Sequence, residues 1–239
     1  RKEYKENTFF GGIVSSSKLI IESEVFSDYD LILLDSSQNS HPPPTLMHRM
    51  FSAVKRIKIL LKNLIFKGPD AALIFASDGA SAIEKGVMVF MCNLLNTKSL
   101  IFPRAGNLVN QTTKSSLFLF FIKFLYRNSS VFLCQGPKWR SYATKTLKIK
   151  KENTLVINNW TATDPLIEIG EKRNYAQNEQ MKVLFVGWLE DFKGVFELLG
   201  AAKILLQLDK NIQFTFVGNG SAMNKAKVFA KESNIEKNI

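Results

Sequence analysis

Short apolar runs alternate along the chain with longer segments in which apolar residues recur every three or four positions. The short runs are typical of buried strands, and the longer segments are typical of amphipathic helices. We expect strands at residues 31–35, 71–76, 99–102, 130–134, 154–157, 183–187 and 212–217. We expect helices at residues 46–66, 81–95, 114–127, 138–147, 194–208 and 221–233. Ser77 or Ser81 is expected to cap the second of these helices, and Ser221 the last.

Strands that alternate with helices predict parallel sheets covered by helices, so the fold class is α/β. Residues 161–180 interrupt the alternation, because they are polar and have no long apolar period. We interpret them as a linker between two Rossmann-like domains, residues 1–160 and residues 181–239. The second domain holds only two βα units, and the chain starts with Arg1 rather than Met. We therefore expect a piece of a longer chain, with the first strand missing and the C-terminal domain truncated.

The charge of the protein is uneven. Lys and Arg number 32 against 21 Asp and Glu, and the net charge is +12 over residues 1–151 but −1 over residues 152–239. Residues 85–151 contain twelve basic residues and no acidic one. The expected helices 46–66 and 114–127 combine this charge with apolar and aromatic residues. Either their basic face is solvated beside a core stripe, or it attaches the protein to an anionic membrane surface. No nucleic-acid motif accompanies the charge, so a nucleic-acid partner is not expected.

Cysteine usage and hydropathy exclude several protein classes. Cys92 and Cys134 are isolated and lack metal-site spacing, which excludes a disulfide scaffold and a structural zinc site. We expect both to be reduced, buried thiols of a cytoplasmic protein. No stretch reaches the ~18–20 apolar residues of a transmembrane helix. The expected location is the cytoplasm, with the inner face of the cell membrane as the site of any attachment.

The candidate chemistry lies at the carboxyl ends of the expected strands, where ligands of doubly wound sheets bind. The richest of these ends is VGWLEDFKG at 186–194, in which a strand runs into glycine and Lys193-Gly194 opens a helix. A lysine at a helix N-terminus adds a full charge to the partial positive charge of the helix, which suits a phosphate or diphosphate. The alternative is that Lys193 is a solvated loop lysine.

The wider pattern resembles a known family. Residues 182–221, KVLFVGWLEDFKGVFELLGAAKILLQLDKNIQFTFVGNGS, resemble the start of the C-terminal domain of family 4 (group 1) glycosyltransferases. FFGGIVSSSKLI resembles the glycine loop of that family after its first strand, and TLVINNW resembles its segment before the domain crossover. The ordered set covers most of the chain.

The resemblance implies the GT-B arrangement and a retaining, metal-independent transfer of a sugar from a nucleotide-sugar donor, with no cofactor. The acceptor it implies is a saccharide or a lipid-linked saccharide in cell-surface polysaccharide or lipopolysaccharide synthesis. It assigns the donor site to Gly11, Gly12, Gly187, Trp188, Lys193, Gly194, Gly218 and Gly220. It places His41, Arg104 and Asn107 on the acceptor side of the cleft.

Three departures from the family pattern open alternatives. Trp188 stands where the family usually has a second phosphate-binding arginine, and an indole supplies neither the charge nor the bidentate bonds of a guanidinium. Asn158-Asn159-Trp160 lacks the usual Pro and Gly. The family's paired catalytic glutamates would lie beyond Ile239, so we expect this piece alone to be inactive. The alternatives are a non-catalytic GT-B-fold binding protein and a nucleotide-sugar epimerase. Asp28-Tyr29-Asp30 is interpreted as a polar turn, and no metal site is expected.

Overall fold

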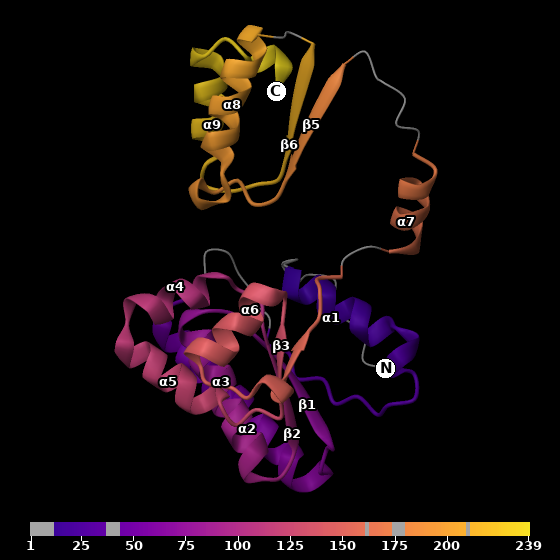
Figure 1. The fold of residues 1–239 in the computed structure, drawn as a ribbon, viewed down its shortest axis with the longest axis vertical. Helices are drawn as coiled ribbons and strands as arrows, with labels where there is room; N and C mark the ends of the chain where they lie inside the picture. Colours follow the sequence, from indigo (N-terminus) through magenta and orange to yellow (C-terminus); the bar gives the residue numbers. More distant parts are fainter. Residues whose placement is uncertain (1–11, 37–43, 161–162, 174–179, 209–210) are drawn as a thin grey trace. The chain divides into compact units, whose positions relative to one another are not determined.

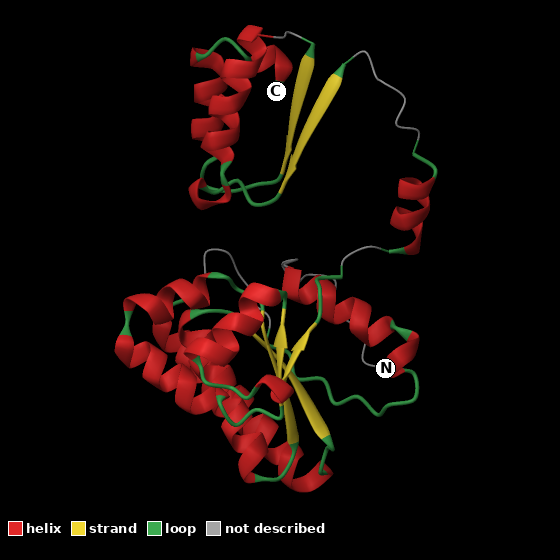
Figure 2. Ribbon diagram, viewed as in Figure 1, coloured by secondary structure: helices red, strands yellow, loops and turns green. Residues whose placement is uncertain are grey.

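The computed structural model describes residues 12–36, 44–160, 163–173, 180–208 and 211–239. The chain divides into two compact units, Arg1–Thr163 and Asp164–Ile239. Each unit contains a parallel sheet with helices packed on it (Figures 1 and 2). The predicted α/β class is therefore confirmed.

The first unit is built on a four-stranded parallel sheet with the strand order β1-β2-β3-β4. Its strands are β1 (Ala71–Ala76), β2 (Lys98–Pro103), β3 (Val131–Cys134) and β4 (Thr154–Val156). Its α-helices are α1 (Gly12–Glu22), α2 (Leu46–Lys67), α3 (Gly79–Leu94), α4 (Asn107–Lys114), α5 (Ser116–Tyr126) and α6 (Pro137–Ser141). Short turns of other helical types lie at Glu24–Phe26, Tyr142–Thr146 and Lys151–Asn153. Figure 1 shows α1 on the opposite side of this sheet from α3 and α5.

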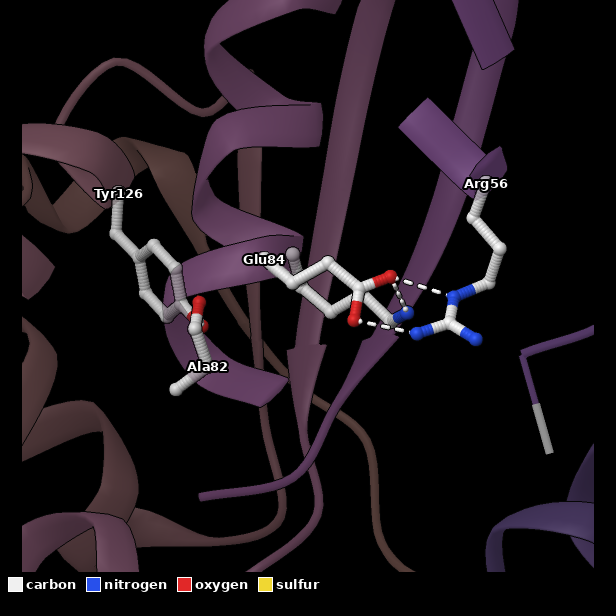
Figure 3. Close-up of polar contacts among 5 residues, drawn as sticks. Arg56, Ala82, Glu84 and Tyr126 are labelled. Atoms are coloured by element: carbon white, nitrogen blue, oxygen red, sulfur yellow. Dashed lines mark hydrogen bonds and ion pairs between the residues drawn. The ribbon is translucent and has the colours of Figure 1, made fainter. Parts of the chain in front are cut away.

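The core of the first unit lies between the sheet and helices α3 and α5. Tyr126 of α5 is fully buried, and its hydroxyl donates a hydrogen bond to the carbonyl oxygen of Ala82 in α3 at 2.9 Å (Figure 3). Gly86 permits the close approach of the two helices, because a Cβ at this position would lie 2.8 Å from the Cβ of Leu125. The buried hydrogen bond and the close approach at Gly86 add to the apolar packing of the two helices in the core.

A buried charge cluster joins α2 to α3. The guanidinium of Arg56 donates two hydrogen bonds to the carboxylate of Glu84, at 2.7 and 2.9 Å (Figure 3). The ammonium of Lys85 donates to the same carboxylate at 3.1 Å. Burial raises the pKa of Glu84, but the hydrogen bond from Arg56 and the charge of Lys85 outweigh it, so the net pKa is lowered. Burial lowers the pKa of Lys85 more than Glu84 raises it.

The sequence prediction for the first unit is correct for four strands and for the helix observed as α5, and wrong at two places. Residues 31–35 were expected to form a buried strand, but they have no regular structure, and only Leu34 packs against the core. A short apolar run becomes a strand only when a neighbouring strand completes its hydrogen bonds. Ser77 and Ser81 do not cap α3, because Asp78 occupies the N-cap position. The expected helix 114–127 is observed as α5. It is capped by Ser115, which accepts a hydrogen bond from Phe118 N at 3.2 Å, and it follows a separate helix, α4, that was not expected.

The second unit contains a two-stranded parallel sheet. Its strands are β5 (Met181–Val186) and β6 (Ile212–Val217), and its helices are α7 (Asp164–Glu171), α8 (Val195–Leu208) and α9 (Met223–Glu232). Short 3-10 turns lie at Asp191–Lys193 and Glu236–Asn238. Helices α8 and α9 bury one face of the sheet around Phe214, while Leu184 and Val186 on the other face are exposed. The segment interpreted as a linker includes α7, which buries none of its described residues.

Candidate functional site

Two loops meet at the carboxyl end of the sheet in the second unit. Residues 187–194 follow β5, and residues 218–220 follow β6. Because the strands are parallel, both loops leave the same edge of the sheet. Backbone hydrogen bonds join them: Gly187 N donates to Val217 O at 3.0 Å, and Leu189 N donates to Asn219 O at 2.9 Å. These two hydrogen bonds therefore fix the two loops against each other.

Glycine is required where the two loops cross. A Cβ at Gly218 would overlap the carbonyl oxygen of Gly187, and a Cβ at Gly220 would overlap that of Leu189. The resemblance assigned both glycines to a turn beside the nucleotide. In the structure their lack of a side chain lets the two backbones touch, which brings several peptide groups to one edge of the sheet.

Gly194 connects the first loop to helix α8. Its backbone is left-handed, with φ +82° and ψ +21°, and this conformation favours glycine. Gly194 ends the 3-10 turn Asp191–Lys193, and its carbonyl oxygen accepts the bond from Leu198 N at 3.0 Å. The first N–H groups of α8 have no acceptor within the helix, and Val195, which begins the helix, is buried.

Lys193 precedes this helix and is exposed. Its ammonium nitrogen lies 5.4 Å from the centroid of the Phe192 ring, and none of the ion pairs of the described residues includes it. An exposed ammonium beside the N-terminus of a helix is suited to pair with an anion. Trp188 is also exposed in this loop, where its indole can stack on a ligand but cannot neutralise charge.

Glu190 ties the two loops together, and the sequence analysis did not single it out. Its carboxylate accepts hydrogen bonds from the backbone N–H of Ser221, at 3.0 Å, and from the hydroxyl of the same residue. The prediction that Ser221 caps the last helix is wrong, because α9 begins at Met223 with Ala222 at its N-cap position. The sequence did contain a signal for this contact, because an acidic residue and a serine follow two strands expected to be parallel. The loops after parallel strands lie at the same edge of the sheet.

The first unit has a second group of polar residues at the carboxyl end of its sheet, around Arg104. The guanidinium carbon of Arg104 lies 4.9 Å from the ring centroid of Phe102 and 5.2 Å from that of Trp160. Nη2 of Arg104 donates to the hydroxyl of Ser16 in α1 at 3.1 Å, and the indole N–H of Trp160 donates to the carbonyl oxygen of Ser16 at 3.2 Å. Nη1 is buried and has no hydrogen-bond partner among the described residues. Burial lowers the pKa of Arg104. The arginine is thus held in place, and its Nη1 has no hydrogen-bond partner among the described residues.

Asn107 lies near Arg104 in sequence but has a partner of its own. Its amide donates a hydrogen bond to the carboxylate of Asp78 at 2.6 Å, which joins the segment after β2 to the segment after β1. Gly79 N donates to the side-chain oxygen of Gln111 at 2.8 Å and makes a second link between these segments. Asp78 and Gln111 were not among the predicted site residues.

The remaining predicted positions are only partly described. Gly11 and His41 lie outside the described residues, and Gly12 is the first residue of α1. Across the residues that the structure describes, no group of three or more His, Cys, Asp or Glu is placed to hold a metal ion. Nor is any described helix long and apolar enough to cross a membrane.

The two cysteines are buried and unpaired. Burial raises the pKa of Cys92 and of Cys134 to about 11. A thiol with so high a pKa is a poor nucleophile, because the thiolate is the reactive form. Neither residue is therefore a candidate for covalent catalysis.

Comparison with known proteins gives structural matches but no sequence match. No protein-family model matches the chain, and no curated protein matches it at a significant level. The structure is similar to that of a TarM variant from S. aureus in complex with fondaparinux, α-GlcNAc-glycerol and UDP, with a TM-score of 0.54 and 16% sequence identity. It is also similar to HepE from Anabaena in complex with UDP, with a TM-score of 0.54 and 13% identity.

These matches establish the fold. Each covers 77% of this chain but only 35% of TarM and 50% of HepE, so the chain spans half or less of either protein. The likeness shows that the chain has an α/β fold of the GT-B type.

Proposed function

We propose that the protein containing this chain is a glycosyltransferase that moves a sugar from a nucleotide-sugar donor to a saccharide or a lipid-linked acceptor. The observation that carries this proposal is the pair of joined loops after β5 and β6, with Lys193 and the N-terminus of α8 at the same edge of the sheet. It is supported by the similarity of the fold to TarM and HepE, both of which were solved with UDP.

The donor would bind through its diphosphate. The ammonium of Lys193 would pair with the phosphate oxygens, and the first N–H groups of α8 would donate hydrogen bonds to them. The peptide groups brought together by Gly218 and Gly220 would lie beside the nucleoside. Trp188 would offer a flat apolar surface in this loop in place of a second cation.

In the transfer itself, the bond between the anomeric carbon and the phosphate oxygen breaks, and a bond from that carbon to the acceptor oxygen forms. The acceptor hydroxyl releases its proton to solvent, and the nucleoside diphosphate leaves with an additional negative charge. Lys193 and the helix N–H groups would stabilise that charge as it develops, which favours the transition state over the bound donor. We propose that these groups act without a metal ion or cofactor, and that the anomeric configuration is retained.

The acceptor would bind to the first unit. Nη1 of Arg104 is buried beside Trp160, and this pairing of a cation with an aromatic ring suits a sugar or a phosphorylated sugar. Asn107 would contribute through its link to Asp78. We propose a role in cell-surface polysaccharide synthesis on the cytoplasmic side of the membrane.

The test is product analysis with the full-length protein. It is incubated with UDP-sugars and a lipid extract, and released UDP and glycosylated product are quantified together. Equal amounts of UDP and glycosylated acceptor are expected. Release of a free epimer would instead identify an epimerase. No turnover with any donor would favour a non-catalytic binding protein, the alternative suggested by Trp188 in place of a phosphate-binding arginine.

A matched pair of variants locates the donor site in this assay. Lys193→Gln should lower kcat/KM for the donor about 10- to 100-fold, because a charge-assisted hydrogen bond contributes about 1.5–3 kcal/mol. Lys203→Gln removes the same charge from an exposed position on α8 and should change kcat/KM less than twofold. Equal effects of the two variants would exclude a specific role for Lys193.

A further inference from the structure

The short turn that carries Lys193 lies between two fixed points. The turn comprises Asp191, Phe192 and Lys193, and all three residues are exposed. After the turn, Val195 begins α8 and is fully buried. Before the turn, the chain passes through Glu190 in the loop after β5. The position of Lys193 therefore depends on how the chain is held at its two ends.

The backbone next to Glu190 is fixed by the loop after β6. Leu189 N donates a hydrogen bond to the carbonyl oxygen of Asn219 at 2.9 Å, and the carbonyl oxygen of Leu189 accepts one from Ala222 N at 2.9 Å. The side chain of Leu189 is buried. These contacts join the two loops as far as Leu189, one residue short of the place where the turn departs.

The side chain of Glu190 extends the contact between the loops toward the turn. Its Oε1 accepts a hydrogen bond from Ser221 N at 3.0 Å, and its Oε2 accepts one from the hydroxyl of Ser221. The carbonyl oxygen of Glu190 accepts the bond from Lys193 N at 2.9 Å, which closes the turn. Glu190 thus binds the second loop through its side chain and the turn of Lys193 through its backbone.

The charge of Glu190 opposes the function proposed for this edge of the sheet. A carboxylate beside a diphosphate repels it, and Asp191 adds a second negative charge. Charge alone therefore predicts that loss of Glu190 strengthens the binding of a nucleoside diphosphate. The hydrogen bonds predict the opposite result, because two bonds to a charged acceptor keep the turn in one arrangement. An experiment can separate the two effects, since they have opposite signs.

We propose that Glu190 is a positioning residue of the donor site, and that its two hydrogen bonds to Ser221 hold the turn in the arrangement in which Lys193 meets the diphosphate. This inference rests on the proposed function, because it concerns the same site. Glu190 itself makes no contact with the donor. The apparent dissociation constant of a ligand rises as the competent arrangement of its site becomes less populated. Glu190 therefore increases the affinity for an anion although it is an anion itself.

The test is the binding of UDP to this chain, measured by isothermal titration calorimetry. Glu190→Ala should raise Kd about tenfold, which corresponds to a competent arrangement populated about one tenth of the time. Glu190→Gln should raise Kd less than about threefold, because its amide can accept from Ser221 N and donate to the hydroxyl oxygen of Ser221. Tighter binding by Glu190→Ala, or equal losses in the Ala and Gln variants, would overturn the proposal.

Asp191→Asn is the matched control for charge. It removes the same negative charge from the exposed neighbour of Glu190 and should leave Kd unchanged or lower it by up to about twofold. A loss of affinity equal to that of Glu190→Ala would show that any change in this turn weakens binding, and would contradict a specific role for Glu190.

A double-mutant cycle tests the contact with Ser221. Ser221→Ala removes one of the two hydrogen bonds and should raise Kd about threefold in the wild type, but should have no effect in the Glu190→Ala background. Additive effects would show that the two side chains act separately, and would contradict the proposal.

Two readouts separate positioning from a purely structural role. A structural role would lower the free energy of unfolding of Glu190→Ala in urea but leave the Kd of the folded chain for UDP unchanged. In the full-length protein, positioning predicts that Glu190→Ala lowers kcat/KM for the donor about tenfold and leaves KM for the acceptor unchanged. Absence of UDP binding by the wild type would overturn the proposed donor site and this inference with it. Binding by the wild type that Glu190→Ala does not weaken would overturn this inference alone.

Discussion

Removal of the Glu84 charge should destabilise the first unit strongly. The Glu84 carboxylate accepts three charge-assisted hydrogen bonds, two from Arg56 and one from Lys85. The side chains of Glu84 and Lys85 are only 9% and 6% exposed. Glu84→Gln keeps the shape but leaves Lys85 as a buried, uncompensated cation. Loss of one member of such a pair costs about 3–5 kcal/mol of the free energy of unfolding.

A second substitution separates charge burial from lost packing. Lys85→Met in the Glu84→Gln background removes the uncompensated cation and should restore about 2 kcal/mol. Arg56 is more exposed and can turn to water in either variant. The control is Glu22→Gln, which breaks the exposed pair with Lys18 and should cost less than about 1 kcal/mol.

Urea unfolding followed by tryptophan fluorescence measures these differences. Trp139 and Trp160 report on the first unit, and Trp188 is replaced by phenylalanine in every variant so that the second unit stays silent. A cost below 1 kcal/mol for Glu84→Gln, or no recovery on adding Lys85→Met, would refute the reasoning.

The pH dependence supplies a further check. Because the pKa of Glu84 is lowered in the folded state, its stabilisation is fully present above the ordinary pKa of a carboxyl group. It is lost as the pH falls through the lowered pKa of the folded state. The difference between wild type and Glu84→Gln should therefore be constant from neutral pH down to about pH 5 and shrink in more acidic solution.

Three other predictions concern the core of the first unit. Gly86→Ala should lower the free energy of unfolding of the first unit by about 1–3 kcal/mol in urea, because the new Cβ would lie 2.9 Å from the ring of Tyr126. The matched control is Gly200→Ala in α8, where a Cβ meets no atom within 4 Å, and it should stabilise the second unit by about 0.5–1 kcal/mol. Tyr126→Phe should cost about 1 kcal/mol, since it removes the buried hydrogen bond from the tyrosine hydroxyl to the carbonyl oxygen of Ala82. Cys92 and Cys134 should resist a thiol reagent at pH 8, where a pKa of about 11 leaves about one thiolate in a thousand, and should react fully in urea. Fast labelling of the native protein, or a Gly86→Ala variant as stable as wild type, would contradict this view of the core.

Local pattern was sufficient to predict most of the regular elements. The run at 71–76 is apolar throughout, the run at 212–217 is mostly apolar, and they form β1 and β6. The run at 31–35 looks the same in sequence but forms no strand, because pairing depends on a neighbouring strand that a single segment does not reveal. Likewise, the apolar period of α5 gave no sign that Ser115 would separate it from α4.

The chemistry of the candidate site was predicted less completely than the fold. Lys193 and the glycines could be proposed from their place after expected strands. The hydrogen bond that joins the two loops could not be predicted, because Glu190 and Ser221 are 31 positions apart in the sequence. The hydrogen bond from Arg104 to Ser16 could not be predicted either, because these residues are 88 positions apart. Partners at such separations are brought together by the tertiary fold and leave no local signal.

The most direct test of the donor site is a titration of the isotope-labelled chain with UDP, followed by nuclear magnetic resonance of the backbone amides. The account predicts saturable shifts of the Gly194, Gly218 and Gly220 signals, which UDP causes and uridine does not, because the site binds the diphosphate. Lys193→Gln should weaken the binding at least tenfold. The account would be contradicted if these glycine signals did not move, or if Lys193→Gln bound UDP as tightly as the wild type.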